Sequence, residues 1–264
     1  MRIVLFCCVL LNTCISQSWG KDILLYVYSD QSVKRPYLFE LEKEMHNMDV
    51  DMISYPIDVR RTVDEHVLRI DSIFRDYREK TDSLGIFMLA DEEASFVALD
   101  VLSKDTAIIA LFAMSGVFCN GDDYFYNEVS IKKNLMMLDS VSFDNKKERH
   151  LRMVYKMISY AKQGKTFKIP KGADEQMCNL FNLLNSRYGR SLLEFSLDDH
   201  LKRIRSWIIP FYRNKNQSSE LELYIGKLLY VGALYGVKYT EPQSYNEEYV
   251  GSEIVKHVSN LLIH

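Results

Sequence analysis

Glycine and proline are scarce in this chain, with 11 glycines and five prolines among 264 residues. No Gly-rich loop of the kind that cradles nucleotide phosphates is present, so the sequence gives no support to nucleotide binding. An excess of charge is lacking as well, because 33 basic and 36 acidic side chains leave a net charge of −3. This balance argues against binding to nucleic acid or to an anionic membrane.

Cysteine and histidine are too few and too scattered for a disulfide framework or a metal site. Three of the five cysteines lie within the first 14 residues, which leaves Cys119 and Cys178. These two either pair with each other or remain two buried thiols, and the sequence leaves both open. None of the six histidines stands at ligand spacing from a cysteine or a second histidine. We therefore expect no metal and no cofactor.

Only one long apolar run is present, from Ile3 to Leu11, directly after Arg2. Small and polar residues follow it, and this pattern predicts a secretory signal peptide over residues 1–20, with cleavage after Gly20. We therefore expect a secreted or periplasmic protein. The remaining chain has no second run long enough to span a bilayer.

Two alternatives remain for this leader. Cleavage near Ser16 is the first. The second is lipoprotein anchoring at Cys14, which is less favoured because Thr13 is an unusual residue immediately before a lipidated cysteine.

The whole chain is 47% hydrophobic and 12% aromatic, enough for a large core. Apolar, β-branched segments alternate with segments of helical periodicity, which predicts an α/β domain with a mainly parallel sheet flanked by helices. We expect a single domain over residues 21–264. Its first strands are predicted at 22–30, 49–56, 84–89 and 107–114, and its first helices at 35–48, 62–80 and 91–103.

The second half differs from the first. Residues from about 122 to 190 lack strand patterns and are typical of a helical, cap-like insertion. Beyond it we expect a strand at 206–212, a helix at 218–232, a short strand at 234–239 and a last helix at 248–264.

The segment GIFMLADEEASFVAL, residues 85–99, combines a buried strand with a helix across a sharp turn. Together with the order of the other elements, it resembles the nucleophile elbow of α/β-hydrolases, in the branch of secreted bacterial acyl hydrolases whose elbow has the sequence Gly-His-Ser-Glu-Gly-Gly. Small residues must lie two places either side of the nucleophile, and Ala90 and Ala94 do so about Glu92. The resemblance therefore implies that Glu92 replaces the nucleophilic serine, between Asp91 and Glu93.

The same resemblance implies that the other two triad members are replaced. The acid position falls on Asn216, and the histidine position falls on Ala233, within residues 231–235. A backbone amide near Ser29 is the expected oxyanion donor. Loss of the whole triad implies a protein without serine-hydrolase activity. Its cleft, with Ser29 and residues 91–93, would bind a small ligand or a protein partner whose identity the sequence does not reveal.

Other interpretations of the acidic turn stay open. Its three carboxylates are also typical of a helix N-terminus, where they accept hydrogen bonds from the first amides. A hydrolase with a rearranged site could use Glu92 or Glu93 with a histidine such as His257. A cation site of Glu92 with Asp122 or Asp123 and a purely structural scaffold complete the alternatives. Oligomeric state is not predicted.

Overall fold

A computed structural model describes residues 21–29, 35–80, 85–127, 145–169, 171, 175–213, 218–246 and 249–262. Two predictions, the signal peptide at residues 1–20 and the triad position at Asn216, lie outside the described residues.

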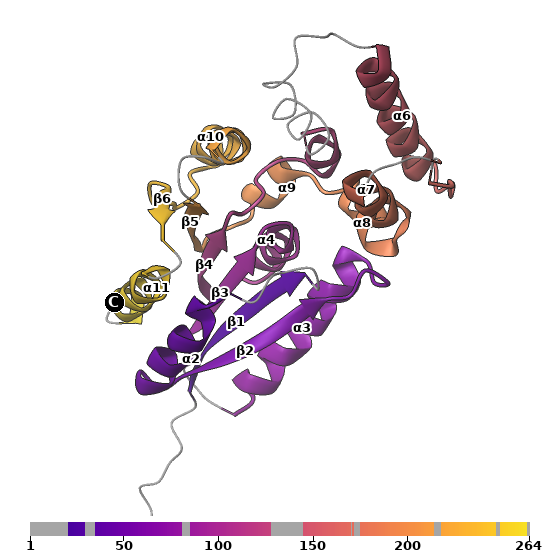
Figure 1. The fold of residues 1–264 in the computed structure, drawn as a ribbon. Helices are drawn as coiled ribbons and strands as arrows, with labels where there is room; N and C mark the ends of the chain where they lie inside the picture. Colours follow the sequence, from indigo (N-terminus) through magenta and orange to yellow (C-terminus); the bar gives the residue numbers. More distant parts are fainter. Residues whose placement is uncertain are drawn as a thin grey trace, which may run out of the picture.

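A six-stranded sheet forms the centre of the molecule, with strand order β2-β1-β3-β4-β5-β6 (Figure 1). All neighbouring strands are parallel. The carboxyl ends of all six strands therefore lie along one edge of the sheet, where parallel α/β sheets place their binding sites. The strands are β1 (Asp22–Ser29), β2 (Val50–Ile57), β3 (Ile86–Asp91), β4 (Ile108–Met114), β5 (Trp207–Arg213) and β6 (Gln243–Tyr245).

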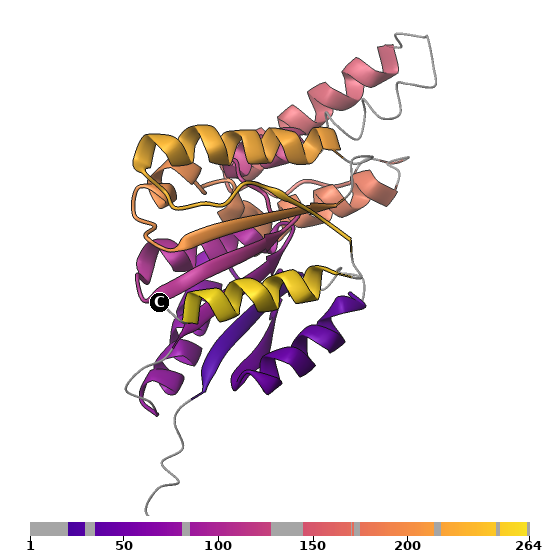
Figure 2. The same cartoon turned by 90° about the vertical axis from the view of Figure 1, so that its left-hand side faces the viewer.

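Helices cover both faces of this sheet, which confirms the predicted α/β class. One face carries α2 (Tyr37–Asn47) and α11 (Val250–Leu262); the other carries α3 (Val63–Arg78), α4 (Ala94–Lys104), α9 (Leu197–Leu201) and α10 (Ser218–Tyr235). Figure 2 shows α10 and α11 on opposite sides of the strands. Within the described part of the chain, no helix is both long and apolar enough to cross a membrane.

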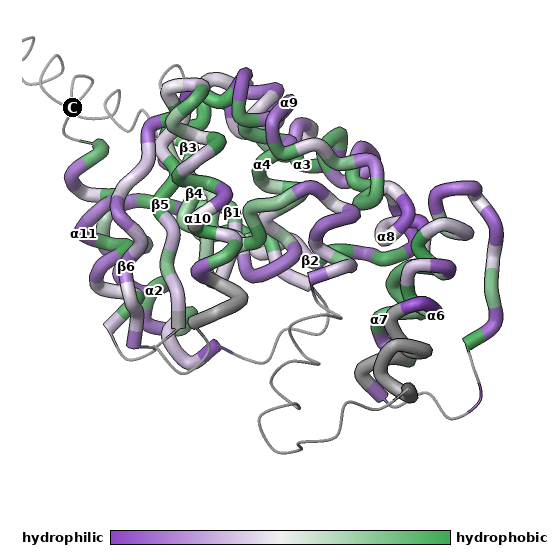
Figure 3. Tube along the Cα trace, turned by 90° about the horizontal axis from the view of Figure 1, so that it is seen from above, coloured by the Kyte–Doolittle hydropathy of each residue, from purple (hydrophilic) through white to green (hydrophobic). Residues whose placement is uncertain are grey.

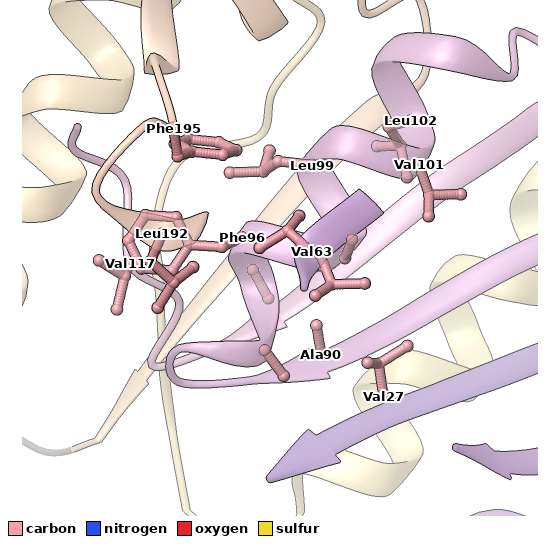
Figure 4. Close-up of a cluster of buried hydrophobic side chains, with 14 of the residues drawn as sticks. Val27, Val63, Ala90, Phe96, Leu99, Val101, Leu102, Val117, Leu192 and Phe195 are labelled. Atoms are coloured by element: carbon pink, nitrogen blue, oxygen red, sulfur yellow. The ribbon is translucent and has the colours of Figure 1, made fainter. Parts of the chain in front are cut away.

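The strands at the centre are apolar on both faces because helices cover both sides. Every residue of β3 is buried. The hydropathy colouring in Figure 3 shows green, hydrophobic segments at the central strands. Figure 4 shows part of the cluster around the turn between β3 and α4, with Val27 near Ala90 and with Phe96 near Val117 and Leu192. Burying a side chain such as Phe96 contributes about 1.5–3 kcal/mol, so this cluster anchors the turn.

Helix α3 begins as the sequence predicts. The Thr62 hydroxyl accepts a hydrogen bond from the Glu65 amide at 3.2 Å, and the Glu65 carboxylate accepts one from the Thr62 amide at 2.8 Å. This reciprocal pair is a capping box, which satisfies two amides that have no partner inside the helix.

The predicted strand at 234–239 is wrong. Helix α10 continues to Tyr235 and ends at Gly236, whose φ of +68° is left-handed. The Val237 amide donates to the Gly232 carbonyl at 3.0 Å, which with Gly236 forms the glycine-dependent helix end known as a Schellman motif. Only Tyr239 then bridges to the sheet, at Ile208, before β6 begins at Gln243.

Between β4 and β5 the described chain is helical. It contains α6 (Asn145–Lys162), α7 (Glu175–Asn185) and α8 (Arg187–Leu192), followed by α9. Figure 1 shows α6 and α7 beyond the end of the sheet rather than on its faces. Cys119 and Cys178 are both thiols and are not bridged to each other.

Candidate functional site at the elbow

Glu92 is the tip of a tight turn between β3 and α4. Its φ is +46°, in the left-handed region that an L-residue adopts at a cost of about 1–2 kcal/mol. Two interactions hold the turn: the Glu92 amide donates to the Met114 carbonyl at 2.9 Å, and the Ser95 hydroxyl donates to the Glu92 carbonyl at 2.6 Å. A strained residue at the tip of a strand-to-helix turn is typical of a nucleophile elbow.

The residues on either side of this tip are small because the strand and the helix pack closely there. Ala90 and Ala94 have no exposed surface. Ala90 lies in register with Val27 of β1 and Ala113 of β4. The backbone therefore presents residue 92 at the carboxyl edge of the sheet.

Asp91 lies inside the protein, beneath the tip. It is the last residue of β3 and is 2% exposed. Its Oδ2 accepts hydrogen bonds from the Tyr26 hydroxyl at 2.6 Å and from Arg35 Nε at 3.1 Å. Its Oδ1 accepts one from the Tyr37 hydroxyl at 3.5 Å. A buried carboxylate is stabilised by three donors, one of which carries a positive charge.

These groups influence one another's pKa values. Burial raises the pKa of Asp91, while the Tyr26 hydrogen bond and the charge of Arg35 oppose that rise. Burial would lower the pKa of Arg35, but Asp91 and Glu92 outweigh it and hold the pKa above its ordinary value. Burial, followed by the Asp91 charge, raises the pKa of Tyr37. The Tyr37 hydroxyl and the Arg35 guanidinium therefore keep their protons and donate them in hydrogen bonds.

Arg35 also binds Glu92, through Nη2 and Oε1 at 3.1 Å. The Arg35 side chain is 6% exposed, whereas that of Glu92 is 51% exposed. A single buried guanidinium thus connects the internal Asp91 to the carboxylate at the tip of the elbow. One oxygen of Glu92 is held by this ion pair.

Helix capping does not explain the acidic turn. Helix α4 begins at Ala94 rather than at Asp91, and Asp91 belongs to the preceding strand. Among the described residues, Glu93 occupies the N-cap position of α4 but makes no capping hydrogen bond with its side chain. The carboxylates of Asp91 and Glu92 bind Arg35 instead.

Ser29 and Glu93, the expected oxyanion region, lie at the same edge as Glu92. Val27 is in register with Ala90. Ser29 and Glu92 each lie two residues further along the chain, so they reach the same level at the edge of the sheet. The Glu93 carbonyl accepts a hydrogen bond from the Tyr188 hydroxyl at 3.1 Å. Tyr188 is buried, and it ties the elbow to helix α8.

Ala233 does not join this group. It lies in the last turn of α10 with an exposed side chain. The chain that follows bridges Tyr239 to Ile208, near the start of β5, whereas Glu92 follows the end of β3. The structure therefore places Ala233 and Glu92 toward opposite ends of the sheet. The carboxyl end of β6, at Tyr245, lies at the same edge of the sheet as Glu92.

Three of the described histidines, His66, His200 and His257, have partners other than Glu92. His66 contacts the Tyr55 hydroxyl at 2.8 Å, and His200 contacts Asp100 at 3.1 Å. His257, the histidine named for a rearranged site, contacts the Gln243 side chain at 3.1 Å. Among the histidines whose side chains the structure describes, none is hydrogen-bonded to an elbow carboxylate.

The alternative cation site is not assembled either. Asp122 pairs with Lys162 at 2.8 Å, and Asp123 pairs with Lys227 at 3.7 Å. In the described ranges, no three His, Cys, Asp or Glu side chains gather as a metal site would require.

Comparison with solved protein structures identifies the fold that carries this site. No protein-family model and no curated protein matches the sequence. Solved structures do match over most of their length. A thermostable carboxyl esterase from Bacillus coagulans has a TM-score of 0.57 at 9% identity, covering 92% of this chain and 91% of the esterase.

Two further structures give the same result. Est1E from Butyrivibrio proteoclasticus has a TM-score of 0.54 at 10% identity, covering 93% of this chain and 90% of Est1E. FphF, a fluorophosphonate-binding serine hydrolase of Staphylococcus aureus, has a TM-score of 0.50 at 11% identity, covering 92% of this chain and 84% of FphF. The chain therefore has the α/β-hydrolase fold.

Sequence reasoning did not find Arg35, Tyr26 and Tyr37 as site residues. The signal for Arg35 was its position, in the loop after β1 and just before α2, at the edge where three acidic residues were expected. Tyr26 and Tyr37 were assigned only to a buried strand and a helix. Their hydroxyls meet Asp91 only after the chain has folded.

Proposed function

We propose that this chain is an α/β-hydrolase-fold protein without serine-hydrolase activity, retained for binding a small ligand or a protein partner. The observation that supports this proposal is the Glu92 carboxylate at the tip of the elbow, ion-paired with the buried Arg35. A nucleophile elbow needs a reactive group at that tip, with a base beside it.

The ion pair makes Glu92 a poor replacement for serine. A nucleophilic carboxylate must give up its interactions to attack a carbonyl carbon, and the buried Arg35 can follow it only by leaving Asp91. A carboxylate nucleophile also needs an activated water to hydrolyse its acyl intermediate. A histidine normally acts as the base that activates this water. His66, His200 and His257 bind elsewhere, and no histidine among the described side chains is hydrogen-bonded to Glu92.

A second candidate is an ester or acyl hydrolase with a rearranged carboxylate site. It is favoured by the esterases among the structures that share the fold and by the 51% exposure of the Glu92 side chain. In that case Glu92 or Glu93 acts as the base and a water attacks the substrate directly.

The proposed location is secreted or periplasmic, with the signal peptide at residues 1–20 as its basis in the sequence. Binding then takes place outside the cytoplasm, at the edge formed by Ser29 and residues 91–93.

Ester turnover separates the two candidates. Purified protein is incubated with short-chain aryl esters, beside the variant Glu92→Ala and the control Glu42→Ala, an exposed glutamate on α2. We expect all three to match the uncatalysed rate. Turnover well above background that Glu92→Ala abolishes and Glu42→Ala leaves unchanged would establish the hydrolase and refute the proposal.

A further inference from the structure

A cavity of about 520 Å³ opens beside the end of β2, apart from the elbow. Asp58 follows the last residue of β2, Arg61 precedes α3, and Arg187 begins α8. The charged residues that line the cavity are Arg60, Arg61, Arg69, Arg187, Asp58 and Glu65. Nothing in the sequence pattern marked these residues as a group, because α8 lies more than a hundred residues after α3.

Positive charge is in excess in this cavity, although the whole chain has a net charge of −3. Four guanidinium groups face two carboxylates. Asp58 is shared between Arg60 at 2.9 Å and Arg61 at 3.4 Å, and Glu65 pairs with Arg187 at 2.8 Å. Within the described chain, Arg69 makes no ion pair. Arg69 and the N–H groups of Arg61 and Arg187 that lie outside these ion pairs can therefore donate hydrogen bonds to an anion.

The side chains beneath the cavity are influenced by the same charges. Burial lowers the pKa of His66, and the positive charges of Arg61 and Arg69 lower it further. The carbonyl of Asp58 can only accept, so His66 Nε2 donates to it and Nδ1 accepts from Tyr55. His66 is therefore neutral, and it does not compensate the positive charge of the arginines as a carboxylate would.

Apolar surface lies beside the charged groups. Leu68 lines the cavity and is 69% exposed, and Val59, next to Asp58 in the chain, is 46% exposed. The Val59 carbonyl is fixed by the Tyr188 amide at 3.2 Å. A ligand that places its charge among the arginines can lay an apolar portion along Leu68.

We propose that this cavity binds a small amphiphilic anion: a phosphate, sulfate or carboxylate group joined to an apolar chain. The arginines supply paired N–H donors that suit the planar or tetrahedral oxygens of such a group. This site does not depend on the function proposed for the elbow, because it shares no lining residue with it.

Isothermal titration calorimetry on the full chain tests the proposal, with hexyl phosphate, hexyl sulfate, hexanoate and the uncharged hexanol as probes. The variants are Arg61→Gln and Arg69→Gln. The matched control is Arg75→Gln, which removes an exposed arginine from the same helix, where it pairs with Asp71 at 2.6 Å. Circular dichroism checks that each variant is folded.

We expect at least one of the three anions to bind, hexanol to bind far more weakly, and each cavity variant to raise Kd about tenfold. Arg75→Gln and Glu92→Gln should leave Kd unchanged, and added salt should weaken binding. The proposal is overturned if no anion binds the wild type, if hexanol binds as tightly as the anions, or if Arg75→Gln weakens binding as much as Arg69→Gln.

Discussion

Arg35 is the residue on which the candidate site depends most. It is buried, it neutralises the buried Asp91, and it binds the exposed Glu92. Such a bridge is costly to build, because two charges leave water, and it is more costly to break on one side. Its role is therefore to fix the position of the elbow carboxylates rather than to add net stability.

Removing Arg35 alone should be severe. We predict that Arg35→Met lowers the free energy of unfolding by about 3–5 kcal/mol, because it leaves an uncompensated charge at Asp91. Asp91→Leu combined with Arg35→Met should recover a large part of that loss, since both charges are then absent. Urea denaturation of the wild type, both single variants and the double variant measures this. Additive losses would show that Arg35 and Asp91 act independently, against this interpretation.

At the level of single elements, helix packing leaves no room for a side chain at Gly189 but leaves room at Gly226. A methyl group on Gly189 of α8 would lie 2.0 Å from the Leu183 carbonyl oxygen, whereas a methyl group on Gly226 of α10 meets nothing within 4 Å. The two positions are both helical, so they separate packing from helix propensity.

We therefore predict opposite effects for the two substitutions. Gly189→Ala should lower the free energy of unfolding by at least about 2 kcal/mol, because α8 must shift away from α7. Gly226→Ala should raise it by up to about 1 kcal/mol, because alanine favours the helix. Thermal and urea denaturation measure both. A stable Gly189→Ala protein would mean that α7 and α8 do not pack as described.

Several elements could be predicted from the sequence because local signals determine them. The capping box at Thr62 and Glu65 indicates the start of α3, and the apolar run before Asp91 indicates β3. The end of α10 was misjudged because the segment around Tyr235 and Val237 is rich in β-formers, and the left-handed Gly236 was not weighed as a helix terminator.

The site was less predictable than the fold. Glu92 at the elbow tip followed from the two small neighbours, Ala90 and Ala94, which are a local requirement of the turn. Arg35 and Tyr26 reach Asp91 from positions more than fifty residues away in the chain, so no local pattern could indicate them. Ala233 was placed by a short similarity in sequence, which did not contain the information that α10 continues through it.

For the whole molecule, the buried His66 and the half-buried His257 predict how stability depends on pH. Burial lowers the pKa of His66 and that of His257. The unfolded chain therefore binds more protons than the folded chain once the pH falls below the ordinary histidine pKa of about 6.5. Stability from these two groups is present above that pH and decreases as the pH falls through it.

We predict that the free energy of unfolding falls between pH 7.5 and 5.5, and that His66→Gln reduces the slope of this decrease. The exposed His46, changed to glutamine, is the control and should leave the slope as it is. Urea denaturation across this range provides the data. An unchanged slope in His66→Gln would show that His66 is not held neutral in the folded protein.

We propose that the molecule keeps the elbow geometry of a hydrolase, with the Glu92 carboxylate in place of a nucleophilic serine. Ser95 is hydrogen-bonded to the turn itself, and Ser115 directly follows β4 at the same edge of the sheet, where its φ of +50° is also left-handed. A serine hydrolase reacts with a fluorophosphonate because its triad activates the hydroxyl. Residue 92 is not a serine, and among the described side chains no histidine is hydrogen-bonded to an elbow carboxylate, so we expect no activated hydroxyl.

The most direct measurement is intact-protein mass spectrometry after incubation with a fluorophosphonate, with a known serine hydrolase as the positive control. The account predicts that the mass of this protein does not change while the control gains one adduct. A stoichiometric adduct that peptide mapping assigns to Ser115, or to any other serine at the carboxyl edge of the sheet, would contradict it.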